Sequence, residues 1–209
     1  MSKNLANARD TSNYESVSDQ SEWLYWNVEK TEFIADCKIF EVNKILATSK
    51  CGQEKSGNFF TLDCGSWVNV IPLTEQNDVI MVEQYRHGIQ ALTLEIPGGS
   101  VEVSDGDAGV AALRELREET GCEADRCTFL GKNYPNPALQ NNFCFTYLAE
   151  AVRQVETPKF DGTGTERICI RKVKLSEIPT LIRIGTINHA LVIAAFHFLT
   201  LERPELFLS

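Results

Sequence analysis

Apolar and polar positions alternate in short runs over the first half of this chain. Runs rich in β-branched and aromatic residues, bounded by polar or glycine-containing turns, are typical of strands. They predict strands at residues 38–42, 45–49, 59–63, 67–73, 79–85 and 92–96. The first three form a small antiparallel meander, and the last three begin a larger sheet.

The second half of the chain contains both the periodicity of helices and that of strands. Residues 107–120 have the spacing of an amphipathic helix, and the continuation predicts strands at 127–133, 142–149 and 167–174 followed by helices at 175–184 and 187–201. The last helix is apolar nearly all round, which predicts burial against the sheet or a partner subunit. The chain is therefore expected to be an α/β protein with one main core.

Composition divides the chain further and limits its partners. Residues 1–22 begin with a Ser- and Asn-rich run and are expected to be a flexible arm, 23–64 a β extension, and 65–209 the main domain. A formal net charge of −9 disfavours nucleic acid and anionic membranes as partners. We see neither a membrane-spanning stretch nor a signal peptide, and the seven cysteines lack a C-x-x-C pair, so a reduced cytoplasmic protein without structural zinc is expected.

The most informative segment is the acidic end of the 107–120 helix. Glu115, Glu118 and Glu119 stand at i, i+3 and i+4, so they share one helical face at the negative end of the helix dipole. The carboxylates on this face repel one another, and the negative end of the dipole repels each of them. Both effects oppose this arrangement unless a divalent cation binds there. The alternative is a solvated charged face, with Arg114 paired to Glu118.

The flanks of this helix favour a ligand site. Gly121 is placed to end the helix in the left-handed conformation, and the turn Pro97-Gly98-Gly99 lets peptide groups approach a ligand. From Gly99 to Cys122 the chain resembles the signature of the Nudix hydrolases, whose second half, R-E-U-x-E-E-x-G-U with U apolar, is matched at every position. The first half is one residue longer, so either Asp105 or Asp107 replaces the family glutamate.

The resemblance implies a Nudix α/β/α sandwich with a mixed sheet, in which the N-terminal antiparallel β extension contributes to a homodimer. It also implies that Mg²⁺ or Mn²⁺ is held by Glu115, Glu118, Glu119 and the Gly98 carbonyl, while Arg114 orients a carboxylate. Hard cations of this kind prefer oxygen ligands and neutralise a pyrophosphate. The general base is either Glu118 or Glu166 of a later loop.

Segments outside the signature resemble the ADP-ribose pyrophosphatase and nucleotide-sugar branch of this family: 67–74, 83–88, 94–99 and 134–138. Arg86 is a candidate for binding the diphosphate or terminal ribose, or else an ion pair with Glu95. Glu95 is a candidate for supporting the metal shell or accepting a sugar hydroxyl. The candidates for stacking on a base are Trp23, Trp26 and Trp67, with core packing as the alternative.

The function that the resemblance implies is metal-dependent hydrolysis of nucleoside diphosphate sugars, with ADP-ribose favoured, to a nucleoside monophosphate and a sugar phosphate. The alternatives are a pyrophosphatase for GDP-mannose or another nucleotide sugar, and a Nudix-fold sensor that binds ADP-ribose without cleaving it. A partner-binding protein with a merely solvated acidic helix is a third possibility.

Overall fold

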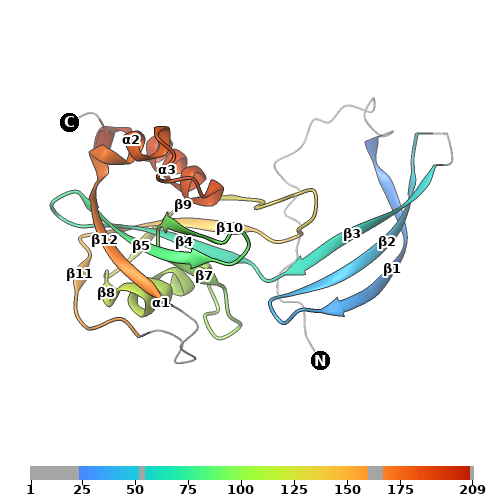
Figure 1. Ribbon diagram of the computed structural model, residues 1–209, viewed down its shortest axis with the longest axis horizontal. Helices are drawn as coiled ribbons and strands as arrows, with labels where there is room; N and C mark the ends of the chain where they lie inside the picture. The colour runs from blue at the N-terminus through green and yellow to red at the C-terminus, as the bar shows by residue number, and fades with distance from the viewer. Residues whose placement is uncertain (1–23, 52–54, 160–166, 208–209) are drawn as a thin grey trace. The chain divides into compact units, whose positions relative to one another are not determined.

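The computed structural model describes residues 24–51, 55–159 and 167–207. Its contacts divide the chain into two compact units, residues 1–64 with 136–141, and residues 65–135 with 142–209. The predicted arm and the loop that carries Glu166 lie outside the described residues. Figure 1 shows the elements of both units.

The first unit is a three-stranded antiparallel meander of β1 (Trp26–Asp36), β2 (Phe40–Ser49) and β3 (Ser56–Cys64). The predicted meander is present, but the two pieces expected at 38–42 and 45–49 are one strand, and β1 was not anticipated. The polar Asn43 and Lys44 look like a turn in the sequence, yet they pair across β2 with both neighbouring strands. Strand pairing on both sides thus outweighs local composition.

The second unit contains a mixed sheet with the strand order β12-β5-β4-β10-β9, in which β6 also pairs with β5 and β7 with β4. The β4–β10 pair is parallel, and the other pairs are antiparallel. The strands are β4 (Trp67–Leu73), β5 (Asp78–Arg86), β6 (Ala91–Glu95), β7 (Gly98–Ser100), β9 (Cys127–Asn133), β10 (Cys144–Glu150) and β12 (Ile168–Lys174). A separate two-stranded ladder joins β8 (Cys122–Glu123) to β11 (Arg153–Gln154).

Helices cover both faces of this sheet (Figure 1). One face packs against α1 (Ala108–Thr120), and the other against η2 (Leu175–Glu177), α2 (Ile178–Arg183) and α3 (Ala190–Glu202), with η3 (Pro204–Phe207) after them. Side chains alternate along β4, so that Val68 and Val70 lie in the α1 core and Ile71 in the α3 core. The predicted α/β/α sandwich with a mixed sheet is therefore confirmed.

The apolar C-terminal helix is buried against the sheet, the first of the two environments predicted for it. Val192, Ala195, Phe196 and Leu199 are buried in one core with residues of β4, β5 and β10. In the part of the chain that the structure describes, no helix is long and apolar enough to cross a membrane.

Candidate active site

The acidic helix α1 is held at both ends by local interactions. At its start, the Asp107 carboxylate accepts a hydrogen bond of 2.7 Å from the Gly109 amide, as an N-cap does. At its end, Gly121 has φ of 67°, and its amide donates to the Arg117 carbonyl at 2.8 Å. The predicted role of Gly121 as the left-handed helix end is confirmed.

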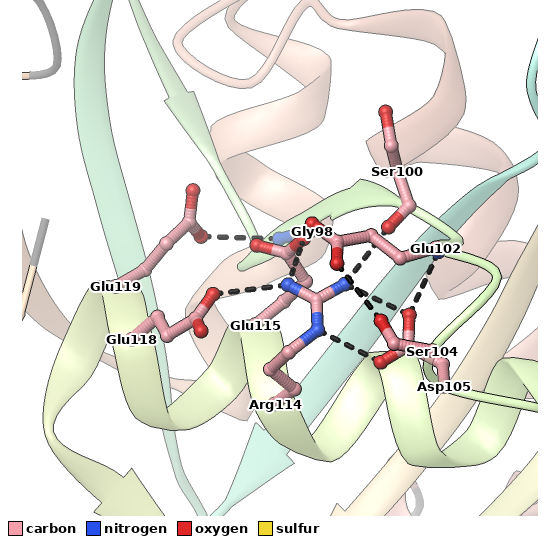
Figure 2. A network of polar contacts seen from close by, with 9 residues as sticks. All are labelled: Gly98, Ser100, Glu102, Ser104, Asp105, Arg114, Glu115, Glu118 and Glu119. Atoms are coloured by element: carbon pink, nitrogen blue, oxygen red, sulfur yellow. Dashed lines mark hydrogen bonds and ion pairs between the residues drawn. The ribbon is translucent and has the colours of Figure 1, made fainter. Parts of the chain in front are cut away.

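Arg114 is the centre of an ion-paired group on this helix (Figure 2). Its guanidinium donates two hydrogen bonds to Asp105, at 2.9 and 3.0 Å, and another to the Ser100 carbonyl at 2.9 Å. A single nitrogen, Nη1, also donates to Glu115 at 2.8 Å and to Glu118 at 2.9 Å. Arg114 therefore orients carboxylates, as expected, and it holds three of them at once.

This geometry distinguishes the two aspartates at the signature insertion. Asp105 forms the bidentate pair with Arg114, whereas Asp107 caps the helix. The hydrogen bond from Arg114 lowers the pKa of Asp105 despite the opposing effect of burial, and Asp105 contributes most to raising the pKa of Arg114. Asp105 thus lies next to Arg114, the arginine of the signature. The one-residue insertion in the signature lies before the helix cap, Asp107.

Glu119 and Glu115 are directed toward the glycine turn. Glu119 as a whole residue is only 4% exposed, and its Oε2 accepts a hydrogen bond of 3.1 Å from the Gly98 amide. A Cβ atom added to Gly99 would collide with the Glu115 carboxylate, so the missing side chain leaves room for that group. Glu118 is the most open of the three, with 47% of its side chain exposed.

The site gathers several carboxylates around one guanidinium. Asp105, Glu115, Glu118 and Glu119 supply four carboxylates, and Arg114 is paired with the first three of them. Within the described residues, no three acidic, cysteine or histidine side chains converge as a ready-made metal cage. The donor set nevertheless fits Mg²⁺ or Mn²⁺, since all four groups offer hard oxygen atoms beside an open glycine turn.

Arg86 and Glu95 form an ion pair, which was the predicted alternative to a substrate-binding role for Arg86. The guanidinium binds both carboxylate oxygens, at 2.7 and 2.6 Å, and the Thr93 hydroxyl donates to the same carboxylate at 2.5 Å. Burial of Glu95 raises its pKa, but the hydrogen bonds from Arg86 and Thr93 outweigh that effect, so the pKa lies below its ordinary value. The Arg86 side chain keeps 44% of its surface exposed, so it remains a candidate for an anionic ligand.

Trp67 begins β4, directly across from Ser100 of β7 and Cys144 of β10. It is half-buried, and its stacking on a base remains a prediction. Glu166 and Trp23 lie outside the described residues, so no geometry bears on their predicted roles. Trp26 belongs to the other unit, where its ring packs edge-on against Phe59.

Sequence reasoning missed Thr93 and Ser100 as members of these groups. Thr93 reaches Glu95 because residues two apart on a strand share a face. That periodicity could have indicated Thr93. The Ser100 carbonyl is a backbone group with no side-chain signal, so the sequence could not have indicated it.

Comparison with known proteins agrees with this site. The family model of the NUDIX domain matches residues 66–195. This match covers more than half of the chain and includes the whole acidic helix. The chain therefore belongs to the Nudix family, as the signature predicts.

Several curated relatives match part of the chain. The ADP-ribose pyrophosphatase of Bacillus subtilis is 29% identical over 135 residues, 65% of this chain and 72% of that protein. That of Mycobacterium tuberculosis is 30% identical over 92 residues, 44% of each chain. The methanol dehydrogenase activator of Bacillus methanolicus is 37% identical over 89 residues, 43% of this chain and 48% of that protein. The match to two of these three relatives thus spans about half of their length or less.

A solved structure, described as an ADP compounds hydrolase, superposes with a TM-score of 0.73 at 18% sequence identity. The alignment covers 86% of this chain and 95% of the other. At this level of identity the likeness supports the fold, and it agrees with the sandwich described above.

Proposed function

We propose that this protein hydrolyses the pyrophosphate bond of nucleoside diphosphate sugars, with ADP-ribose as the favoured substrate, in the presence of Mg²⁺ or Mn²⁺. The products are a nucleoside monophosphate and a sugar phosphate. The observation that carries the proposal is the cluster of carboxylates gathered at the end of α1 beside Gly98 and Gly99. The named ADP-ribose pyrophosphatases among the relatives support the choice of substrate.

A cation bound there would neutralise the diphosphate and lower the pKa of a water molecule. Each side chain of the site has its own proposed task. Glu115 and Glu119 would hold the cation, with the Gly98 carbonyl as a further ligand. Glu118 lies at the open side, where it binds a cation or accepts a proton from water. Arg114 keeps Glu115 and Glu118 oriented, and Glu166 is the second candidate for the base.

Arg86 provides a positive group for the substrate outside the acidic helix. Its guanidinium is fixed by Glu95, so a phosphate or ribose oxygen meets a pre-oriented fork. Glu95 is then a positioning residue for Arg86. Trp67 is proposed to contact the base or ribose from the start of β4.

The experiment is a panel of ADP-ribose, GDP-mannose and UDP-glucose with Mg²⁺ or Mn²⁺, scored by kcat/KM and by the phosphate fragments released. We expect AMP and ribose 5-phosphate from ADP-ribose at the highest kcat/KM. A higher kcat/KM for GDP-mannose would make GDP-mannose the preferred substrate and leave the proposed reaction unchanged. Binding of ADP-ribose without any AMP release would instead identify a sensor.

A second candidate function follows from the similarity to the methanol dehydrogenase activator. In that case the chain raises the rate of a dehydrogenase. Adding wild-type protein and the Glu118→Gln variant to a methanol dehydrogenase assay tests this role. A rate increase with wild-type protein only would connect it to the hydrolytic site, and no increase with either would exclude this dehydrogenase as a target.

We also propose that the β1–β3 unit is a dimerisation module of a homodimer. In the described part of this unit, Ala47 is the one fully buried hydrophobic side chain. Large apolar side chains are exposed along its strands, among them Val28, Phe33, Phe59 and Phe60. Apolar surface of this extent marks an interaction site. Sedimentation analysis is expected to give a dimer that Phe60→Glu converts to a monomer, and a monomeric wild-type protein would refute the proposal.

A further inference from the structure

Four buried polar side-chain atoms have no hydrogen-bond partner among the described residues. They are Nδ2 of Asn69, Oδ1 of Asn142, Oγ1 of Thr146 and Nδ1 of His189. Buried polar groups in folded proteins are normally hydrogen-bonded, so each exception calls for an explanation. Two of the four, on Asn69 and Thr146, belong to directly paired positions of one sheet.

The pairing places both side chains on the same face. Asn69 of β4 lies opposite Thr146 of β10 in their parallel ladder, and Ile71 lies opposite Leu148 two residues further on. Ile71 and Leu148 belong to the core formed with α3. Because side chains alternate along a strand, Asn69 and Thr146 also point to the α3 face. Thr146 is 1% exposed there.

The neighbours of this polar pair on either side are glycines. Gly98 of β7 is paired with Asn69, and a Cβ atom added to it would lie 2.8 Å from the Asn69 Oδ1 atom. On the other side, Gly131 of β9 is paired with Thr146, and the Phe198 ring occupies the space that a side chain at 131 would need. A polar pair thus adjoins the glycine whose amide binds Glu119.

We propose that Asn69 and Thr146 form a specificity subsite that hydrogen-bonds the neutral nucleoside portion of the substrate. The inference rests on the proposed function, in which the diphosphate would bind at the acidic end of α1. Gly98 donates its amide to Glu119 at that end and is paired with Asn69 in the sheet. The subsite has an amide donor and a hydroxyl but no formal charge. It therefore suits ribose hydroxyls or the acceptor atoms of a base rather than another phosphate.

Unpaired groups of this kind favour specificity at the expense of stability. Among the described residues, Nδ2 of Asn69 and Oγ1 of Thr146 have no hydrogen-bond partner, which weakens the free protein. A substrate that supplies the missing partners gains affinity, whereas an analogue without them leaves the same groups unpaired. Ligand recognition and the stability of the free protein are then expected to change in opposite directions on mutation.

The test uses two nearly isosteric variants of the full chain, Thr146→Val and Asn69→Leu, with ADP-ribose as substrate. We expect each to raise KM about tenfold with a smaller change in kcat, which corresponds to the loss of about one hydrogen bond. We expect the melting temperature without ligand to stay the same or to rise. An unchanged KM in both variants overturns the proposal and leaves an internal water as the partner of these atoms.

Thr74→Val is the matched control. The Thr74 hydroxyl accepts a hydrogen bond of 3.1 Å from the Asp78 amide in the turn after β4. It is five residues along the chain from Asn69, roughly 17 Å for an extended strand. Removing this satisfied hydroxyl is expected to lower the melting temperature and leave KM unchanged, the reverse of the Thr146→Val result.

A binding measurement separates failure of this proposal from failure of the proposed function. A methylene-bridged analogue of ADP-ribose, which resists hydrolysis, is titrated into wild-type protein and both variants by calorimetry. About tenfold weaker binding to the variants supports the subsite even if wild-type protein hydrolyses none of the substrates in the panel. Equal binding to all three proteins rejects it even if hydrolysis is rapid.

Discussion

Two arginine-centred groups lie in the same unit and differ in charge balance. Arg86 faces one buried carboxylate, Glu95, and binds both of its oxygens. Arg114 contacts three carboxylates, Asp105, Glu115 and Glu118, through a guanidinium with the same single charge. The first group thus pairs one guanidinium with one carboxylate, and the second brings three carboxylates to one guanidinium.

From this difference we expect the first group to be structural in the free protein and the second to bind a ligand. The buried Glu95 carboxylate is paired bidentately with Arg86 and accepts a hydrogen bond from the Thr93 hydroxyl. Both of its oxygen atoms therefore have hydrogen-bond partners. A cluster with more carboxylates than cations repels itself and gains stability from a bound divalent ion. We therefore expect mutations at Arg114 and its partners to affect turnover most, and mutations at Arg86 and Glu95 to affect stability as well as binding.

The largest effect is expected for Glu118→Gln. This change removes one charge and one potential metal ligand or base from the open side of the cluster and keeps the shape of the side chain. We predict a loss of kcat of roughly 10²- to 10⁴-fold with an unchanged melting temperature. Glu123→Gln, which removes an exposed partner of Arg153, is the control and is expected to retain activity. A fully active, folded Glu118→Gln protein would remove Glu118 from the mechanism.

A smaller loss is expected for Gly99→Ala. The added methyl group collides with the Glu115 carboxylate and displaces it without changing any charge. Misplacement of a metal ligand should lower kcat on the order of tenfold and raise the Mg²⁺ concentration needed for half-maximal activity. At Gly65, by contrast, an added Cβ atom has open space around it. Comparing the Mg²⁺ dependence of Gly99→Ala with that of Gly65→Ala isolates the collision, and identical curves would argue against it.

Arg86→Ala tests the pair of Arg86 and Glu95. It removes both hydrogen bonds from the guanidinium to the buried Glu95 carboxylate, so we predict a loss of about 1 to 3 kcal/mol in unfolding free energy together with a raised KM. Glu95→Gln keeps one oxygen that can accept from Arg86 and Thr93, although its NH2 group then faces the second Arg86 donor, and it leaves no unpaired buried carboxylate, so it should cost less. Denaturant unfolding of both variants measures the difference. Equal stability of Arg86→Ala and wild-type protein would show that the pair contributes nothing to folding.

The smallest effect is a dependence of stability on acidic pH. The pKa of Glu95 in the folded protein lies below its ordinary value of about 4.3, so its contribution is present above that value. It is lost as the pH falls through the lowered pKa, because the folded state then takes up the proton. Melting temperatures between pH 6 and pH 3 should therefore fall less steeply for Glu95→Gln than for wild-type protein. Parallel curves would contradict the assigned pKa direction.

The main-domain fold was readable from the sequence because local patterns and tertiary packing agree there. The strands at 67–73 and 127–133 coincide with β4 and β9, and the acidic helix differs from the prediction by one residue at its start. In the meander, by contrast, β1 was missed. All but one of its residues are exposed, so the alternation of buried and exposed positions that marks a strand is absent.

The site was predictable to the extent that it follows helical spacing. The carboxylates at 115, 118 and 119 were found because i, i+3 and i+4 share a face. Their unequal exposure was not foreseen, since it depends on how α1 lies against the glycine turn. The pairing of Asp105 with Arg114 also depends on the path of the loop before α1, which spacing alone left open between two aspartates.

The central claim is that the carboxylates clustered at the end of α1 bind a divalent cation. Calorimetric titration of Mg²⁺ or Mn²⁺ into wild-type protein and a Glu115→Gln/Glu118→Gln double variant tests it most directly, with ADP-ribose analogue present and absent. We predict saturable binding to wild-type protein that strengthens with the analogue and is lost in the folded double variant. Equal cation binding by both proteins, or none by either, would contradict the claim.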